Sequence, residues 1–232
     1  MSPRSLLSPH PIVIFTGPFG SGKTEVAINY ARAANAEGRR VCLVDLDIVT
    51  PYFRVGDYRE VLAREGIEVI AAPGALASFE LPALPPEISG ALESDDKHAV
   101  LDVGGDPVGA QLLRTFAGAI GRRSYDLWVV ANPYRPATPT AEALADHARA
   151  IEESSGLRLT GLIANPNLGA LTEPADLERG LCVVSEAAQR LRLPVALAVE
   201  KRLLPRLDAS GCALLVLTLI VRLPWDAASG QE

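Results

Sequence analysis

Residues 12–24, IVIFTGPFGSGKT, decide the fold, because four apolar residues run directly into three glycines, a lysine and a threonine. From Gly17 to Thr24 the stretch fits G-x-x-x-x-G-K-[ST] at every defined position. Glycines allow successive N–H groups to turn inward, and the following helix adds the positive end of its dipole. The stretch therefore predicts a strand, a polyphosphate-binding loop and a helix.

The residue types in the loop predict separate roles. Lys23 is expected to bridge the β- and γ-phosphates, and Thr24 to ligate Mg²⁺ through its hydroxyl, because Mg²⁺ takes hard oxygen ligands. A glycine-rich turn with a chance lysine is the alternative, and the flanking strand and helix disfavour it. The nucleotide contacts predicted here are Gly17, Phe19, Gly20, Ser21, Gly22, Lys23, Thr24 and Glu25.

Two carboxylates follow the apolar half of a second predicted strand, in VDLDIVTPYFR at 44–54. Asp45 and Asp47 are separated by one residue, so they share a face while the chain stays extended. The carboxyl ends of strands in an α/β sheet line the ligand crevice. We therefore predict that both face the phosphates and the metal; solvated turn residues are the alternative.

A third carboxylate ends the apolar strand in HAVLDVGGDP at 98–107, which is the Walker B pattern. Asp102 would hold Mg²⁺ through a water, and Gly105 would let a backbone N–H approach the γ-phosphate. Asp102 to Gly105 also reads D-x-x-G, a pattern found in many nucleotide-dependent switches. Asp106 is expected to cap the helix that begins near Val108.

Later strand ends suggest how the base and a substrate are held. Asn165, in LIANPNLG at 162–169, is placed either to contact a base or to form a turn before Pro166. The guanine-reading N-K-x-D sequence is absent, which favours ATP over GTP. Arg135, in NPYRP, is either a structural arginine or a cation for phosphate or an acidic substrate.

Nearly continuous apolar runs indicate strands that are buried on both faces, as in a parallel sheet covered by helices. The sum is one doubly wound α/β domain with a mostly parallel sheet and helices on both faces, a three-layer α/β/α fold. Predicted strands are 11–16, 41–46, 67–71, 98–103, 126–131, 159–164 and 194–199, and predicted helices are 23–37, 57–65, 85–94, 108–120, 138–155 and 174–192. Residues 212–221 fit either a last strand or a buried helix, 1–10 a flexible tail, 11–223 the single domain and 224–232 a C-terminal tail.

Composition narrows the function classes. The 232 residues carry a net charge of −6, which argues against broad binding to nucleic acid or to an anionic membrane. The three cysteines are far apart and form no C-x-x-C pair, so neither a disulfide framework nor a zinc site is supported. Without a signal-peptide pattern or an apolar run long enough for a bilayer, we expect a soluble, cytoplasmic protein.

Taken in order, these elements resemble the MinD/ParA/CobQ/CobB (SIMIBI-type) group of P-loop NTPases, over about residues 11–207. The segments VDLDIVTPYFR and NPNLG resemble those of bacterial ATP-binding proteins labelled cobyrinic acid a,c-diamide synthase-like. The resemblance implies that Asp47 orients the attacking water, that Asp102 is the Walker B aspartate and that Asn165 contacts adenine. It also implies that residues 193–204 form the last strand and the loop that closes over the base.

One position departs from many MinD/ParA members. They carry a second lysine just after the first glycine of the loop, which reaches the partner's phosphates across a dimer, whereas Pro18 stands here. A nucleotide-sandwich homodimer is thus possible but not implied. The chain also lacks a basic amphipathic C-terminal helix and a glutaminase-sized second domain, so neither membrane attachment nor a self-contained cobyrinate synthase is expected.

Two functions fit these residues. The first is a Mg²⁺-dependent ATPase that works as a switch or assembly factor with a protein partner, with Lys23, Asp47 and Asp102 catalytic and Thr24, Asp45, Asp47 and Asp102 around the metal. The second is an ATP-dependent transferase or ligase that activates a small carboxylate, as in dethiobiotin synthetase-like enzymes, with Arg54 and Arg135 as clamps for an acidic group. Binding without turnover is disfavoured, because Lys23, Thr24, Asp47 and Asp102 occur together.

Overall fold

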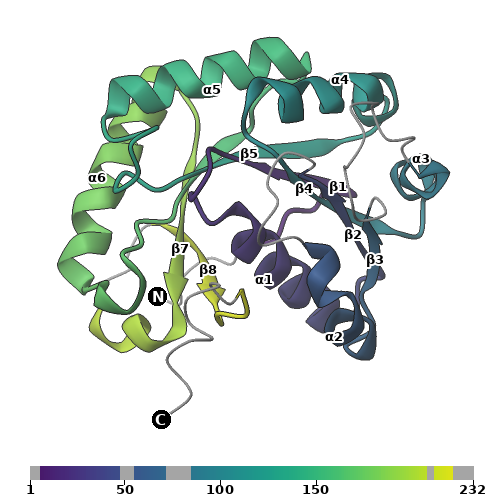
Figure 1. Cartoon of the computed structure of the whole chain (residues 1–232), viewed down its shortest axis with the longest axis horizontal. Helices are drawn as coiled ribbons and strands as arrows, with labels where there is room; N and C mark the ends of the chain where they lie inside the picture. The colour runs from purple at the N-terminus through teal and green to yellow at the C-terminus, as the bar shows by residue number, and fades with distance from the viewer. Residues whose placement is uncertain (1–5, 48–54, 72–84, 208–211, 222–232) are drawn as a thin grey trace.

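The computed structural model describes residues 6–47, 55–71, 85–207 and 212–221 (Figure 1). They form one eight-stranded sheet in the order β3-β2-β4-β1-β5-β6-β7-β8, and every neighbouring pair of strands is parallel. The strands are β1 (Ile12–Thr16), β2 (Val41–Leu46), β3 (Glu68–Ala71), β4 (His98–Val103), β5 (Tyr125–Ala131), β6 (Gly161–Ala164), β7 (Val195–Glu200) and β8 (Ala213–Leu217). The predicted doubly wound α/β fold is confirmed.

Helices cover both faces of this sheet. On one face α1 and α2 share a core with Val13 and Phe15, and on the other α3 to α6 share a core with Ile12 and Ile14 (Figure 1). Alternate residues of β1 thus enter two separate cores, which explains why the strand is apolar at successive positions. The helices are α1 (Lys23–Ala36), α2 (Arg59–Arg64), α3 (Pro86–Glu93), α4 (Pro107–Gly121), α5 (Ala141–Ser155) and α6 (Pro174–Leu191), with 3₁₀ turns η1 (Val55–Tyr58), η2 (Gly169–Leu171) and η3 (Lys201–Arg206).

The start of one predicted helix differs for a local reason, and one open assignment is settled. The helix predicted over 138–155 begins at Ala141, because the Ala143 N–H donates to Thr140 Oγ1 while Thr138 Oγ1 donates to the Asn132 carbonyl. Residues 212–221, which the sequence leaves open, supply strand β8, which pairs with β7 at the end of the sheet.

The strand order places the candidate site. The order turns back beside β1, which lies between β4 and β5, while β2 lies beyond β4. Ligands of doubly wound sheets bind outside the carboxyl ends of the strands at such a point. Those ends here carry Thr16, Asp45 and Asp102.

Residues 6–10, within the predicted tail, pack against the fold. Leu6 is buried, and its N–H donates to the Leu214 carbonyl of β8. The Ser8 N–H donates to Tyr30 Oη, which in turn lies 3.3 Å from His98 Nε2. These contacts join the N-terminal segment to α1 and to the start of β4; residues 224–232 lie outside the described part.

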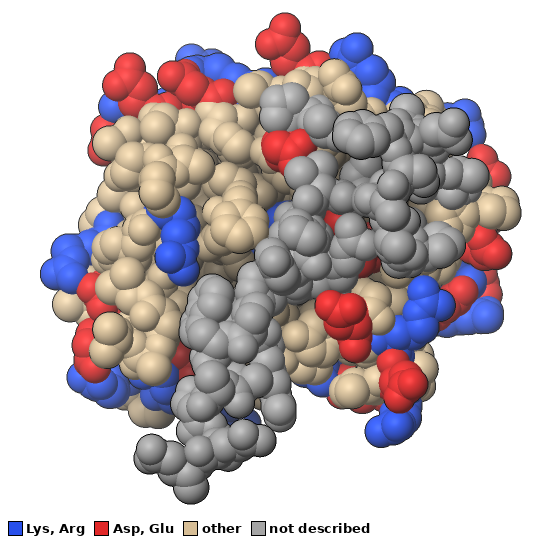
Figure 2. Space-filling view, in the orientation of Figure 1, with Lys and Arg blue, Asp and Glu red and all other residues tan. Residues whose placement is uncertain are grey.

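The surface in Figure 2 carries charges of both signs. Blue and red side chains are interspersed around the rim of this face, and neutral residues occupy much of its left half. On this face the described residues therefore present no broad area of a single sign.

His98 makes the stability of the fold depend on pH. Burial, together with the nearby Arg39 guanidinium, lowers the pKa of His98 from 6.5 to about 4. The unfolded chain then binds more protons between pH 4 and 6.5, so His98 costs stability as the pH falls through that window. We expect the difference in unfolding free energy between wild type and His98→Gln to change by about 2–3 kcal/mol between pH 7 and pH 4. Urea denaturation at both pH values measures it; parallel pH profiles for the two proteins would contradict it.

Candidate functional site

The loop between β1 and α1 closes on itself before the helix begins. The Ser21 N–H donates to the Pro18 carbonyl at 3.0 Å, and the Val26 N–H donates to the Gly22 carbonyl at 3.0 Å. Gly22 is the N-cap of α1 with φ of 83°, in the left-handed region. A helix leaves its first N–H groups without partners inside the helix, so those of Lys23, Thr24 and Glu25 are available to an anion.

A second glycine segment packs directly on this loop. A Cβ on Gly105, just after β4, would lie 2.1 Å from the Gly17 carbonyl oxygen, so only glycine fits there. Thr16 Oγ1 also donates to the Gly104 carbonyl at 3.3 Å. The predicted γ-phosphate contact at Gly105 thus lies against the first glycine of the loop.

Lys23 forms a buried ion pair in this structure. Its Nζ lies 2.8 Å from Asp47 Oδ2, and the two side chains are 7% and 5% exposed. Burial lowers the pKa of Lys23, but the charges of Asp102 and Asp47 together raise it above its ordinary value. The ammonium therefore stays charged beside the loop, where a phosphate would meet it.

Asp102 and Thr24 form the second buried contact. Thr24 Oγ1 donates to Asp102 Oδ2 at 2.7 Å, while Asp102 Oδ1 is buried without a hydrogen-bond partner among the described residues. Burial raises the pKa of Asp102 to about 7, since the Lys23 charge offsets only part of that cost and Asp45 adds to it. Because the threonine proton goes to the carboxylate, the hydroxyl lone pairs remain available to a cation.

Asp45 holds the backbone that follows β2. It is directly opposite Asp102 in the β2–β4 ladder. Its carboxylate accepts from the N–H groups of Asp47 and Gly56, each at 3.2 Å. The structure thus brings the three predicted carboxylates together at the carboxyl ends of β2 and β4, where Asp45 holds the backbone of Asp47.

Asp106 caps α4, as predicted. Its Oδ1 accepts from the Gly109 N–H at 3.0 Å. Its charge also contributes to the raised pKa of Lys23. In the described residues no group of three or more His, Cys, Asp or Glu side chains is arranged to hold a metal ion.

Asn165 contacts the phosphate loop itself. Its Nδ2 donates to the Ser21 carbonyl at 2.7 Å, and a Cβ on Gly22 would lie 2.3 Å from the same nitrogen. Ser21 Oγ is buried without a hydrogen-bond partner in the part of the chain that the structure describes. The sequence could place Asn165 only at a base or in a turn; the structure adds a third role, support of the loop.

Arg135 and Phe19 lie at the exposed rim of the loop. Arg135 Nε donates to the Gly20 carbonyl at 3.3 Å, and the Phe19 side chain is 67% exposed. Arg135 therefore lies beside the loop. The sequence left open whether it is a structural arginine or a cation for phosphate or an acidic substrate. Arg54 lies outside the described residues.

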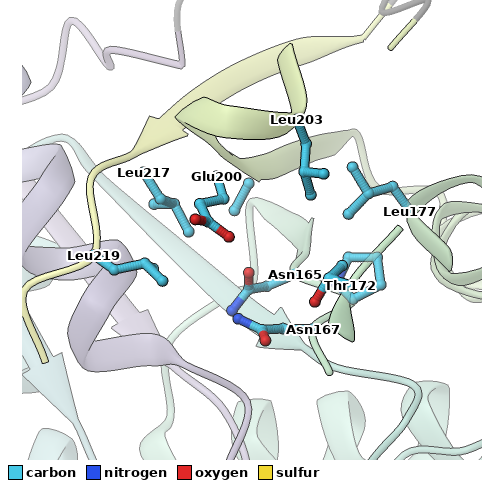
Figure 3. A pocket seen from close by; sticks show the side chains of 10 residues that line it. Asn165, Asn167, Thr172, Leu177, Glu200, Leu203, Leu217 and Leu219 are labelled. Carbon is cyan, nitrogen blue, oxygen red and sulfur yellow. The ribbon is translucent and has the colours of Figure 1, made fainter. Parts of the chain in front are cut away.

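A pocket opens beside Asn165 at the ends of β6, β7 and β8 (Figure 3). Its empty space is about 250 Å³ when the open solvent at its mouth is counted, and the enclosed part is about 10 Å³, roughly the room of one water. The lining combines side-chain amides, one carboxylate and several leucines, from Asn165, Pro166, Asn167, Thr172, Leu177, Ala198, Glu200, Leu203, Leu217 and Leu219. The lining therefore offers both apolar surface and hydrogen-bonding groups at the mouth of the pocket.

Several of these residues could not be assigned from sequence. Glu200 and Leu203 fall within the predicted closing loop, although no signal singled them out. Leu217 and Leu219 lie in the apolar run that fitted both strand and helix. Glu25, predicted at the nucleotide, directs its carboxylate instead to the N–H groups of Ile220 and Val221, leaving its own N–H at the start of α1.

Comparison with known proteins identifies the family. The family model for the CobQ/CobB/MinD/ParA nucleotide binding domain matches residues 12–207. The chain belongs to this family. The match includes the loop, the three carboxylates and Asn165, and its extent agrees with the resemblance seen in the sequence. No match to a curated protein was found.

Solved structures show the same fold. Chloroplast FtsY from Physcomitrella patens is 23% identical, with a TM-score of 0.52, over 82% of this chain and 59% of that one. FtsY from Mycoplasma mycoides is 14% identical, with a TM-score of 0.51, over 85% and 63%. The cell division protein FtsY from Thermotoga maritima is 17% identical, with a TM-score of 0.50, over 85% and 65%. This chain thus matches less than two thirds of each of these chains, and the likeness concerns the fold alone.

No helix in the described residues is both long enough and apolar enough to span a membrane.

The contact of Asn165 with the loop can be tested at Gly22. Gly22→Ala should reduce the unfolding free energy by about 1–3 kcal/mol more than Gly38→Ala, because both positions have left-handed φ but only Gly22 faces a neighbouring atom. Gly38, with φ of 82° and nothing within 4 Å of an added Cβ, is the matched control. Chemical denaturation measures both, and Asn165→Ala should relieve part of the excess in a double-mutant cycle. Equal losses at the two glycines would contradict the packing described.

Proposed function

We propose that this chain binds Mg-ATP and hydrolyses its γ-phosphate as a switch regulated by a protein partner. The observation that carries the proposal is the buried Lys23 ammonium, 2.8 Å from Asp47 and beside a loop with free helix N–H groups. A buried lysine ammonium beside the N–H groups of a helix start can bind a polyphosphate in place of its carboxylate partner.

The chain offers oxygen ligands for Mg²⁺. The Thr24 hydroxyl and Asp102 Oδ1, which has no hydrogen-bond partner in the described part of the chain, are hard oxygen ligands next to the loop. Mg²⁺ commonly takes only one or two protein oxygens and completes its shell with waters and substrate phosphates, so a full protein cage is not required. When bound, Mg²⁺ would neutralise charge on the phosphate oxygens.

Hydrolysis then depends on what Lys23 and Asp47 do. Lys23 would leave Asp47 for the phosphates and stabilise the charge that develops on them. Asp47, released from the ion pair, would orient the attacking water and accept its proton. The family resemblance supports this role for Asp47, and its position between Lys23 and Gly104 supports it independently.

The pocket beside Asn165 is the proposed base site. Its leucines would contact the faces of a purine, and its amides and Glu200 the polar edge. We favour ATP because the N-K-x-D sequence is absent.

One observation keeps an alternative open. The exposed Arg135 guanidinium contacts the phosphate loop, where it would hold a carboxylate acceptor in a transferase or ligase. Transfer of labelled γ-phosphate to a carboxylate metabolite, saturable in that metabolite, would favour this alternative. Slow phosphate release to water that another protein accelerates would favour the switch.

Lys23→Ala should weaken ATP binding at least 100-fold, because the buried cation that meets the phosphates is lost. Lys97→Ala is the control. Lys97 directly precedes β4 and pairs with Glu68 at the start of β3, so it lies at the amino ends of the strands, away from the loop. Titration calorimetry with Mg-ATP and with Mg-GTP measures the affinity of both variants and shows which base the protein prefers. Wild-type protein that takes up neither nucleotide at millimolar concentration would disprove the proposal.

Asp47→Asn should separate binding from turnover. We expect ATP affinity to rise about threefold, because the substitution removes both the ion pair that holds Lys23 and a negative charge near the phosphates. Phosphate release under saturating ATP should fall about 100-fold, since the water loses its orienting carboxylate. Hydrolysis at the wild-type rate would assign the water to another residue.

A further inference from the structure

The first two turns of α1 carry two buried polar side chains that the phosphate site does not use. Glu25 is 8% exposed and Asn29 is 6% exposed. Asn29 Nδ2 donates to Glu25 Oε1 at 2.8 Å and to the Glu25 carbonyl at 2.9 Å. The pair is therefore a fixed unit on the helix that begins at Lys23.

This unit holds the chain that follows β8. The pairing of β8 with β7 ends at Leu217, opposite Glu200. The next N–H groups donate to α1 instead: that of Thr218 to Asn29 Oδ1 at 2.8 Å, that of Ile220 to Glu25 Oε1 at 3.0 Å and that of Val221 to Glu25 Oε2 at 2.9 Å. Residues 218–221 thus lie where the two side chains fix them.

The held segment forms one wall of the base pocket. Leu217 and Leu219 both line the pocket, and Leu219 is 49% exposed although its neighbours are clamped. Figure 3 shows Leu219 on the side of the pocket that faces Asn165. A half-exposed leucine held in this way presents apolar surface to whatever enters the pocket.

We propose that Glu25 and Asn29 are positioning residues for the nucleoside, because they fix Leu219 at the base pocket from the helix that binds the phosphates. The inference rests on the proposed nucleotide site. It adds the residues that hold the wall of the base pocket, formed by residues 217–219, at a fixed position relative to the phosphate loop. Glu25 follows Thr24 directly, so one rigid helical turn serves both halves of the ligand. Ordering the wall in advance reduces the cost of binding a base.

Electrostatics makes the two possible roles of Glu25 give opposite results. A carboxylate next to a phosphate site opposes anion binding. If Glu25 acted only through its charge, Glu25→Gln would strengthen the binding of both ATP and inorganic tripolyphosphate. If Glu25 positions the wall, the same change weakens ATP binding and leaves tripolyphosphate unaffected or slightly tighter, because glutamine keeps only one acceptor oxygen for the two N–H groups.

The test is titration calorimetry of the full chain with Mg-ATP and with Mg-tripolyphosphate. For Glu25→Gln we expect ATP affinity to fall about tenfold relative to tripolyphosphate affinity. Asn29→Ala should act in the same direction. Glu142→Gln, an exposed first-turn glutamate on α5, is the matched control and should change neither affinity. Amide hydrogen exchange at Ile220 and Val221 should be faster in Glu25→Gln and unchanged in the control.

Leu219→Ser tests the wall without touching the clamp. Leu219 is half exposed, so the variant should fold, and it should lower the ratio of ATP to tripolyphosphate affinity as Glu25→Gln does. An unchanged ratio in Glu25→Gln and Asn29→Ala would overturn the positioning role, even if Leu219→Ser lowers it. Wild-type protein that binds tripolyphosphate as tightly as ATP would overturn the base wall and leave the phosphate site intact. Wild-type protein that binds neither would remove the proposed function as well.

Discussion

The site depends on one buried cation that several carboxylates surround. Lys23 is taken out of water at the start of α1, and the charges of Asp47 and Asp102 offset the cost of its burial. Asp102 lies in β4 and Asp47 directly follows β2; these strands are neighbours in the sheet, and β4 also lies beside β1. Removing one partner of such a buried set leaves an uncompensated charge, which is strongly destabilising. The parallel strand order therefore brings together the carboxylates that stabilise the buried Lys23 ammonium.

The same cluster explains why a polyphosphate and a divalent cation belong together here. Asp45, Asp102 and Asp47 place more negative than positive charge at the loop, and burial raises the pKa of Asp102 to about 7. An incoming polyphosphate alone would add to that excess of negative charge. A divalent cation on Thr24 and Asp102 would offset it, so under the proposed function metal and nucleotide bind as a pair.

Local sequence patterns predict the parts of this structure that depend on neighbouring residues. The G-x-x-x-x-G-K-[ST] spacing places the loop, and apolar runs covered on both faces give the strands and the doubly wound class. Contacts between distant segments leave no such pattern. Glu25 meets Ile220 across almost the whole chain, and Asn165 meets Ser21. The apolar run that contains Leu219 fitted either a strand or a helix. Contacts with α1, and not the spacing of its own apolar residues, determine its conformation.

The structure also indicates which elements stay fixed and which exchange partners when the proposed ligand binds. Glu25 and Asn29 tie α1 to the end of β8, and Gly105 packs on Gly17, so the phosphate loop is held from two sides. The Lys23–Asp47 pair is different, because the lysine can exchange its carboxylate partner for a phosphate, which is also an anion. Such an exchange frees the carboxylate of Asp47, while Asp45 still accepts from the N–H groups of Asp47 and Gly56. Under the proposed function, the first change that bound γ-phosphate makes in the protein is therefore the loss of the Lys23–Asp47 pair.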